Sequence, residues 1–421
     1  MGDWIQTTVG EQATLQRGFD ITRNAQRPGP VPVISSSGTS SFHDEAAAKG
    51  PGVVLGRKGV VGSVFFVETD YWPHDTSLWV KDFHGNDPRF VYYFFRSFAP
   101  ELAQLDVGSA NPTLNRNHVH PISIVWPSSV VEQQAISDLL GSLDDKIELN
   151  RRMNETLEAM AQAIFRDWFV DFGPVRRKLA GTTAPVEIMG GLTPDPTRAA
   201  ALAALFPDGL GDDGLPVGWS ERPIGDLVDI AGGSTPSTTD ENLWQPAEHR
   251  WATPKDLSNM SDLALFETGR RISSAGLSKI TSGLLPAGTV LLSSRAPIGY
   301  LAIAQAPVAI NQGFIALMPT ADFGGAYLYL WCKVNMEAVL ANANGSTFQE
   351  ISKKNFRPIT SAVPNDGAVC RAFGEIAEPM FARIVSAAAE TSTLSEARDY
   401  LLPRLMSGAV RVGDIDQVDI S

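Results

Sequence analysis

The side chains best suited to chemistry in this sequence are basic residues in two short turns between apolar segments. Arg57 and Lys58 stand in residues 56–59, and Arg295 stands in residues 293–297. Arginine and lysine supply the commonest contacts to guanine bases and to phosphate oxygens. The two turns are therefore candidate nucleic-acid contacts. The alternative is that they are ordinary solvated turns.

Polar stretches further along the chain offer the same kind of chemistry. Residues 108–117 and 345–354 are rich in amides, hydroxyls and cations, which are the groups that read adenine, guanine and phosphate. The alternative is a loop with a helix cap, since Ser and Asn are good N-caps. A third pair of candidate loops covers residues 35–38 and 253–256. The candidate contacts in these four segments are Ser36, Asn115, Arg116, Asn117, Lys255, Gln349, Lys353 and Lys354.

Catalytic signatures are absent from the sequence. It contains no phosphate-binding Gly-rich loop, no Asn-Pro-Pro-aromatic methyltransferase motif, no His-Glu-x-x-His and no Cys-x-x-Cys. Cys332 and Cys370 both lie in the second half, and no histidine of the first half is histidine in the second. We therefore expect a binding protein with no catalytic residue, metal or cofactor of its own. The alternative is an enzyme whose site has no familiar motif.

An internal repeat places these candidates in two similar domains. A shift of 237 positions carries Gly62 onto Gly299, residues 108–109 onto 345–346, and residues 121–122 onto 358–359. Near the start of each half, Trp4 and Trp219 match at a smaller offset of 215. The second domain thus carries about 22 extra residues, which we interpret as surface loops. The repeat predicts a pseudo-two-fold molecule.

Each domain is predicted to be a mixed α/β unit with a strand-rich core. Short apolar runs alternate with Gly, Pro and Ser clusters, as is typical of strands. One amphipathic helix follows the strands in each domain, over residues 88–105 and 325–340. The predicted strands cover residues 53–55, 64–67, 78–80, 290–292, 300–303 and 314–317.

A long helix is predicted after each domain. Residues 131–172 contain no proline, and apolar positions recur with alternating spacings of four and three, as in a coiled coil. The second helix repeats the pattern, with a kink or a late start expected at Pro379. Each helix would be roughly 60 Å long. Asn150 and Asn154 would face Ala387 and Thr391 in an antiparallel pair and fix its register.

These patterns divide the chain into six segments. Residues 1–128 and 218–365 form the two strand-rich domains. Residues 129–172 and 366–408 form the long helices. Residues 173–217 are a linker that includes a short helix over 199–206. Residues 409–421 are a mobile or docking tail.

The net charge of −13 is unevenly distributed. Nine of those negative charges belong to the two helical segments and the tail, whereas the two domains are close to neutral. A local basic face on each domain is therefore compatible with the composition. No apolar run is long enough to span a membrane, and the N-terminus lacks the pattern of a signal peptide. We expect a cytoplasmic protein.

The arrangement resembles the specificity (S) subunit of type I restriction–modification enzymes over nearly the whole chain. The resemblance rests on the strand–turn pattern ending in Gly62 and Gly299, and on the Gly-Ser…Pro-Ile ending of each domain. Further matching segments are the domain openings at Trp4 and 215–219, residues 232–237, Asn311-Gln312-Gly313, and residues 132–136, 143–147 and 165–169 in the first long helix. The second long helix departs from the pattern, because residues 365–369 replace the Glu-Gln-Gln start.

The resemblance implies a non-catalytic reader of double-stranded DNA. Each domain would be a target-recognition domain, and the antiparallel helices would set the spacing between two half-sites of a split, asymmetric target. Two methyltransferase subunits would dock on the helices, with Phe165, Trp168 and Phe169 as contacts, and motor–nuclease subunits would join for cleavage. S-adenosylmethionine, ATP and Mg²⁺ would be bound by those partners. The alternatives are a methylation-only system and a protein–protein scaffold that does not bind DNA.

Overall fold

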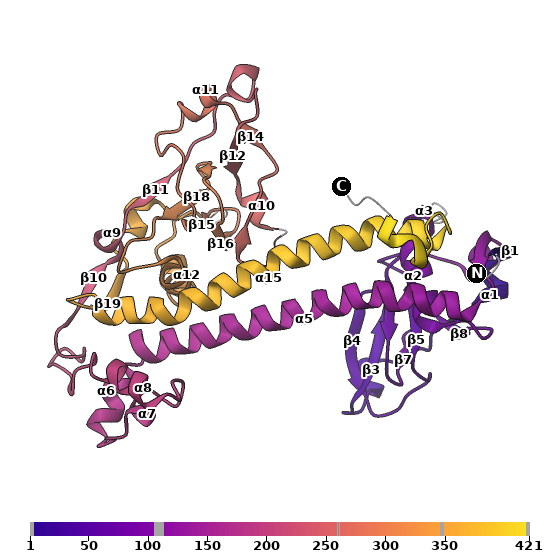
Figure 1. Ribbon diagram of the computed structural model, residues 1–421, viewed down its shortest axis with the longest axis horizontal. Coiled ribbons are helices and arrows are strands. Elements are labelled where there is room, and N and C mark those ends of the chain that lie inside the picture. Colours follow the sequence, from indigo (N-terminus) through magenta and orange to yellow (C-terminus); the bar gives the residue numbers. More distant parts are fainter. Residues whose placement is uncertain (1–3, 105–112, 259, 261, 346–348, 418–421) are drawn as a thin grey trace. The chain divides into compact units, whose positions relative to one another are not determined.

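The structure is a computed structural model that describes residues 4–104, 113–258, 260, 262–345 and 349–417 (Figure 1). The chain forms two compact units, residues 1–148 with 391–421 and residues 149–390. The division falls within the long helices, so each unit holds one strand-rich domain and a part of each helix. Of the Gly-Ser pairs that mark the repeat, Gly108, Ser109 and Ser346 lie outside the described residues.

The first unit builds its domain from a four-stranded sheet, a three-stranded sheet and a two-stranded ladder. Their strand orders are β2-β8-β5-β6, β4-β3-β7 and β1-β9. The strands are β1 (Trp4–Thr8), β2 (Thr14–Arg17), β3 (Val31–Ser35), β4 (Gly38–His43), β5 (Gly52–Gly56), β6 (Val64–Val67), β7 (Trp72–Pro73), β8 (Ser77–Asp82) and β9 (Ser123–Pro127).

The second unit repeats this plan with one more strand in its main sheet. Its strand orders are β11-β18-β15-β16-β13, β14-β12-β17 and β10-β19. The strands are β10 (Trp219–Pro223), β11 (Ile230–Gly232), β12 (His249–Ala252), β13 (Ala264–Leu265), β14 (Arg271–Ile272), β15 (Val290–Ser294), β16 (Ile298–Ala304), β17 (Ala309–Ile310), β18 (Phe314–Leu317) and β19 (Thr360–Pro364). All six strands predicted from the apolar runs are present.

Strand directions agree between the two units. The central strand β3 runs antiparallel to β4 and parallel to β7, and β12 runs antiparallel to β14 and parallel to β17. One residue of each parallel pair is equivalent under the repeat, since Val33 pairs with Trp72, and Trp251 pairs with Ala309, which is Trp72 shifted by 237. The predicted mixed α/β fold with two similar strand-rich domains is confirmed.

The extra residues of the second unit are not merely surface loops, contrary to the prediction. They follow β12 and include α10 (Pro254–Ser258) and β13, whereas β14 is the counterpart of β4 and is followed by α11 (Ser274–Leu277). Strand β13 pairs in parallel with β16 and widens the sheet. Leu257, Leu263 and Leu265 are buried in the hydrophobic core. Burial of these leucines removes apolar surface from water, and this stabilises the packing of the insertion against the rest of the unit.

The amphipathic helix after the strands is broken at the same place in both units. One helix was predicted over each segment, but each forms two: α2 (Pro88–Ser97) with α3 (Ala99–Gln104), and α12 (Gly325–Val334) with α13 (Met336–Ala341). The breaks fall at Phe98 and Asn335, which are 237 residues apart and share nearly the same backbone angles. The repeat therefore extends to a local irregularity of the backbone.

The two predicted long helices are confirmed as α5 (Val130–Phe169) and α15 (Ala368–Met406). In the second unit, Asn150 Nδ2 donates to Ala387 O and Asn154 Nδ2 donates to Ile384 O, each over 3.4 Å. In the first unit, Arg398 donates to Asp144 over 2.8 Å. Later residues of α5 meet earlier residues of α15, so the helices pack antiparallel within each unit (Figure 1).

Pro379 does not delay the second helix, contrary to one of the predicted outcomes. Helix α15 begins at Ala368 and continues through Pro379. Proline leaves the carbonyl four residues earlier, that of Glu375, without its helical donor. Both residues are exposed, so water can satisfy that carbonyl.

The linker contains more helix than predicted, and residues 409–417 of the tail contact the rest of the first unit. The linker contains α6 (Gly173–Leu179), α7 (Pro185–Ile188) and α8 (Pro196–Ala203), the last overlapping the predicted short helix. In the tail, residues Val412–Gln417 form a short 3₁₀ helix. Arg411 stacks over the ring of Trp4 at 4.8 Å and pairs with Glu132, which also accepts from the Trp4 indole N–H. Through Arg411, the tail thus contacts both β1 and α5.

Candidate nucleic-acid interface

The structure brings the basic turn and the polar stretch together in the first unit. The backbone N–H of Leu114 donates to the carbonyl oxygen of Arg57 over 2.9 Å, and Lys58 forms a β-bridge with Thr113. On its other side, Arg57 N donates to Thr76 O over 3.0 Å. Two segments that are more than fifty residues apart in sequence therefore form one surface.

The second unit makes the same connections at equivalent positions. Ile351 N donates to Ser294 O over 3.0 Å, and Ser294 N donates to Gly313 O over 2.8 Å. Arg295 forms a β-bridge with Glu350. Ser294, Gly313 and Ile351 are Arg57, Thr76 and Leu114 shifted by 237. The main-chain frame of the site is thus duplicated.

The third pair of loops joins the same frame. In the first unit, Ser36 N donates to Thr76 Oγ1 over 3.3 Å, and Ser63 Oγ donates to Ser36 O over 2.6 Å. In the second unit, Lys255 lies on α10, directly after Pro254, and Pro254 packs against Gly313 so closely that a Cβ there would lie 2.8 Å from Pro254 Cγ. All three predicted clusters therefore converge in each unit.

Most of the predicted contact residues are available to a ligand. Arg57, Ser36 and Arg295 are half-buried. The exposed ones are Lys58, Asn115, Arg116, Asn117, Lys255, Gln349, Lys353 and Lys354. Asn115 also caps the short helix α4 (Arg116–Val119) by accepting from Asn117 N over 3.0 Å. Ser352 caps the equivalent helix α14 (Lys353–Phe356). In both units the cap is therefore followed directly by a basic residue, Arg116 or Lys353.

The charges around Arg57 are closely spaced. Its Nη1 donates to Asp75 O over 3.3 Å. Burial, and then the nearby positive charge of Arg17, lower the pKa of Arg57, while Asp75 opposes that shift. In the second unit the carboxylate of Glu350 lies 3.8 Å from Arg295. The electrostatic surroundings of the two turns therefore differ, although their backbones match.

Arg17 is a site residue that the sequence patterns did not single out. It ends β2, and its Nη2 lies 3.0 Å from Asp75 and 3.6 Å from Asp20. It lines a cavity of about 720 Å³ in the first unit together with Gln16, Asp20, Arg57, Asn115 and Arg116. Comparing charges between the repeats could have found it, because the offset of 215 places Arg17 opposite Gly232.

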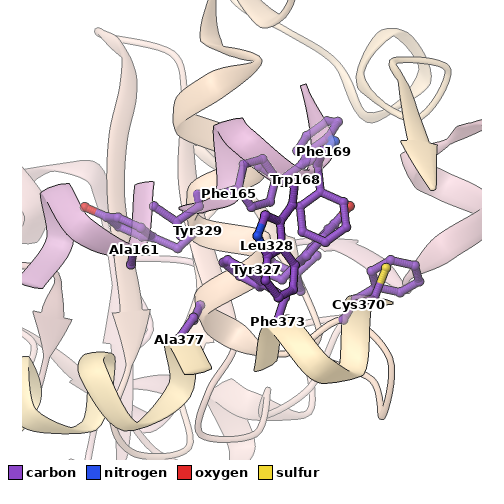
Figure 2. Packing of buried hydrophobic residues seen from close by; sticks show 14 of the residues in the cluster. Ala161, Phe165, Trp168, Phe169, Tyr327, Leu328, Tyr329, Cys370, Phe373 and Ala377 are labelled. Carbon is purple, nitrogen blue, oxygen red and sulfur yellow. The ribbon is translucent and has the colours of Figure 1, made fainter. Parts of the chain in front are cut away.

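The predicted contact of Phe165, Trp168 and Phe169 with a partner is wrong. All three are buried in the core of the second unit, at 1%, 2% and 5% exposure (Figure 2). Phe165 packs edge-on against Tyr327 at 5.1 Å, and Phe169 against Phe373 at 5.5 Å. The helical spacing correctly marked an apolar face, but α12 and α15 of the same chain cover it.

Other kinds of site find no support among the described residues. No group of three or more His, Cys, Asp or Glu side chains is placed to hold a metal ion. Cys332 and Cys370 are buried free thiols, and burial raises the pKa of both. In the part of the chain that the structure describes, no helix combines the length and apolarity that crossing a membrane requires.

Duplicated domains that each display loops bearing cations and amides, with paired long helices, are an arrangement suited to a DNA-recognition protein. The comparisons with known proteins agree. The family model described as "Type I restriction modification DNA specificity domain" matches residues 1–159 and 216–368. The chain belongs to this family. It is a specificity subunit of a type I restriction–modification system, a non-catalytic subunit that recognises the DNA target.

Individual relatives cover different shares of the chain. The type I restriction enzyme HindI specificity subunit of Haemophilus influenzae is 29% identical over 332 residues, which is 71% of each chain. The MjaIX specificity subunit of Methanocaldococcus jannaschii is 36% identical over 153 residues, about a third of each chain. The crystal structure of the S subunit from M. genitalium superposes with a TM-score of 0.62 over 96% of each chain. At 16% identity, that likeness shows the fold alone.

Proposed function

We propose that the two units read the two halves of a split, asymmetric DNA site. The observation that carries this proposal is the duplicated hydrogen-bond frame, Thr76–Arg57–Leu114 in one unit and Gly313–Ser294–Ile351 in the other. A frame shared between repeats in this way holds their loops in the same geometry. Each unit would then present its loops to one half-site in the same way.

Different side chains on the same frame account for the asymmetry of the target. The first unit presents Arg57, Lys58 and Arg116. The second presents Arg295 and Lys353, and at the position of Arg57 it has the buried Ser294. Base edges are distinguished by side-chain donors and acceptors, whereas phosphate contacts position the protein. We therefore expect two half-sites of unrelated sequence.

We further propose that methyltransferase subunits dock on the exposed side of α5. Leu149 and Met160 are 59% and 44% exposed, and Met153 is half-buried between them. Spacings of four and seven place all three on one face of a helix. This face takes the place of the buried aromatic residues as the partner surface. S-adenosylmethionine would belong to the methyltransferase, and ATP and Mg²⁺ to motor–nuclease subunits that join for cleavage.

Mapping methylated bases tests the proposal directly. The chain is co-expressed with the methyltransferase encoded nearest to it, and host DNA is read by long-read sequencing. We expect one motif of two short half-sites around a fixed gap. Lys58→Ala with Arg116→Ala should alter one half-site, and Arg295→Ala with Lys353→Ala the other. Alteration of the same half-site by both pairs would contradict the assignment of one unit to each half.

Salt dependence separates a DNA reader from a protein scaffold. Each Lys or Arg that neutralises a phosphate releases a counterion, so the logarithm of the binding constant falls linearly with the logarithm of salt concentration. Loss of one phosphate contact, as expected for Lys354→Ala, should reduce that slope by about 1. A complex with the methyltransferase that methylates no motif and binds DNA without salt dependence would favour the scaffold.

A further inference from the structure

The cavity beside Arg17 in the first unit holds charges of both signs. Three arginines line it, Arg17, Arg57 and Arg116, and the carboxylate of Asp20 lines it as well. Asp75 is ion-paired with Arg17 over 3.0 Å. The side chain of Asp20 is 82% exposed, so its oxygens are open to a ligand. Arg116 is exposed and forms no ion pair among the described residues.

Two of these guanidinium groups are held in place before any ligand binds. Arg17 contacts Asp75 and Asp20 over 3.0 and 3.6 Å, and Arg57 donates to the Asp75 carbonyl oxygen over 3.3 Å. A planar guanidinium fixed in this way presents its remaining N–H groups in a set direction. Such preorganisation favours a ligand with paired acceptors in one plane.

The mixture of charges fits a base pair better than a phosphate. A phosphate would gain from the arginines but would be repelled by Asp20 and Asp75. In the major groove, guanine presents the acceptors O6 and N7, and its partner cytosine presents the N4 amino donor. A G·C pair therefore needs cationic donors and an acceptor side by side, as the cavity provides.

We propose that this cavity reads one G·C base pair through the major groove. Arg17 donates to N7 of the guanine and Arg57 to its O6, and Asp20 accepts from N4 of the cytosine. The inference rests on the proposed function, in which the first unit reads one half-site. It adds Arg17 and Asp20 as specificity-determining residues and names the base pair that they select.

The second unit has a different arrangement at the equivalent position. Gly232 replaces Arg17, and a Cβ on Gly232 would lie 3.2 Å from the Lys353 ammonium nitrogen. Lys353 thus lies over the place where the first unit has an arginine. Arg295 is 3.8 Å from Glu350. The G·C requirement is therefore specific to the half-site that the first unit reads.

The test uses the full chain with its methyltransferase and DNA that carries the mapped motif. In a set of duplexes, 7-deazaguanine replaces one guanine of the first half-site at a time and so removes the N7 acceptor. We expect wild-type affinity to fall roughly 10- to 150-fold at one position, the range for the loss of one hydrogen bond to a charged group. Arg17→Ala should bind unmodified DNA with a similar loss and be insensitive to 7-deazaguanine at that position.

Two further variants make the comparison sharper. Asp20→Asn should relax discrimination at the same base pair and at no other. Arg27→Ala is the matched control, because Arg27 is an exposed arginine of the same unit that pairs with Asp44 at 2.7 Å and Glu45 at 3.3 Å but does not line the cavity. It should bind like wild type. Circular dichroism checks that each variant is folded.

The possible failures of the two proposals are distinct. A split motif whose first half-site lacks a G·C pair would overturn the base assignment and leave the bipartite reader intact. So would an Arg17→Ala variant that weakens binding to all sequences equally with a smaller salt slope, since that outcome identifies a phosphate contact. Absence of any split motif with the wild-type chain would instead refute the proposed function itself.

Discussion

His120 Nε2 accepts a hydrogen bond of 2.9 Å from the backbone N–H of Leu15. The equivalent residue of the second unit, Arg357, donates to the carbonyl oxygen of Ile230 over 3.0 Å. Leu15 and Ile230 match under the offset of 215. Two chemically different side chains therefore hold the same strand, one by accepting and the other by donating. In the first unit, that strand ends at Arg17.

Acid should weaken the first unit through His120. The ring must be neutral to accept from Leu15, and its pKa is lowered from 6.5 by burial and by the charge of Arg116. Below pH 6.5 the histidine therefore takes up a proton more readily in the unfolded chain than in the folded one. The stability contributed by neutral His120 is complete above pH 6.5 and is lost as the pH falls. We expect the wild-type urea midpoint to drop more between pH 7.5 and 5.5 than that of His120→Gln, whose amide oxygen can still accept. An identical drop in both proteins would contradict this role.

Removing the Arg411 side chain should loosen the first unit. Arg411 covers the Trp4 ring and pairs with Glu132, whose side chain is only 17% exposed. Because the pair is partly open to solvent, we expect Arg411→Ala to cost about 1–2 kcal/mol. Denaturation followed by tryptophan fluorescence measures this. Asp414→Ala, in the same tail, is the control and should leave the midpoint unchanged.

Truncating the aromatic core of the second unit should destabilise the protein itself. Phe165 is 1% exposed and packs against Phe169, Tyr327 and Phe373. Replacing such a side chain with alanine leaves a cavity and costs about 3–5 kcal/mol. Phe165→Ala should therefore lower the thermal midpoint whether or not the methyltransferase is present. An unchanged midpoint with lost partner binding would restore the partner-contact prediction.

Negative charges on the exposed face of α5 should weaken methyltransferase binding and leave the stability of the protein nearly unchanged. Leu149→Asp with Met160→Asp changes two side chains that contribute little to the core, since they are 59% and 44% exposed. We expect stability to stay within about 0.5 kcal/mol of wild type. Methyltransferase binding, measured by calorimetry, should fall at least tenfold. Glu155→Ala, at an exposed position of the same helix, serves as the control.

Asn154 should stabilise the helix pair of the second unit. Its Nδ2 lies 3.1 Å from Asp262 Oδ1 and 3.4 Å from Ile384 O, and the residue is 7% exposed. Loss of this buried donor should cost about 1–3 kcal/mol, because its acceptors would stay desolvated. Urea denaturation of Asn154→Ala measures the cost. A variant as stable as wild type would show that the asparagine is not needed to hold α5 against α15.

The sequence by itself determined the repeat, the strands and the long helices. Strands such as Val53–Leu55 and the helix α5 are visible because apolar spacing is a local property of the chain. Constant offsets between the halves also match Arg57 to Ser294 without reference to their positions in space. Local patterns could not show that the breaks at Phe98 and Asn335 divide the amphipathic helices.

Only the tertiary structure determined which segments distant in sequence are in contact. The periodicity that marked Phe165 and Trp168 as an apolar stripe does not say which surface covers that stripe, and the chain's own α12 and α15 cover it. Likewise, Arg17 and Arg57 are forty residues apart and share a cavity because β2 and β5 both pair with β8. Contacts between segments distant in sequence depend on strand pairing and packing, which single-residue patterns do not encode.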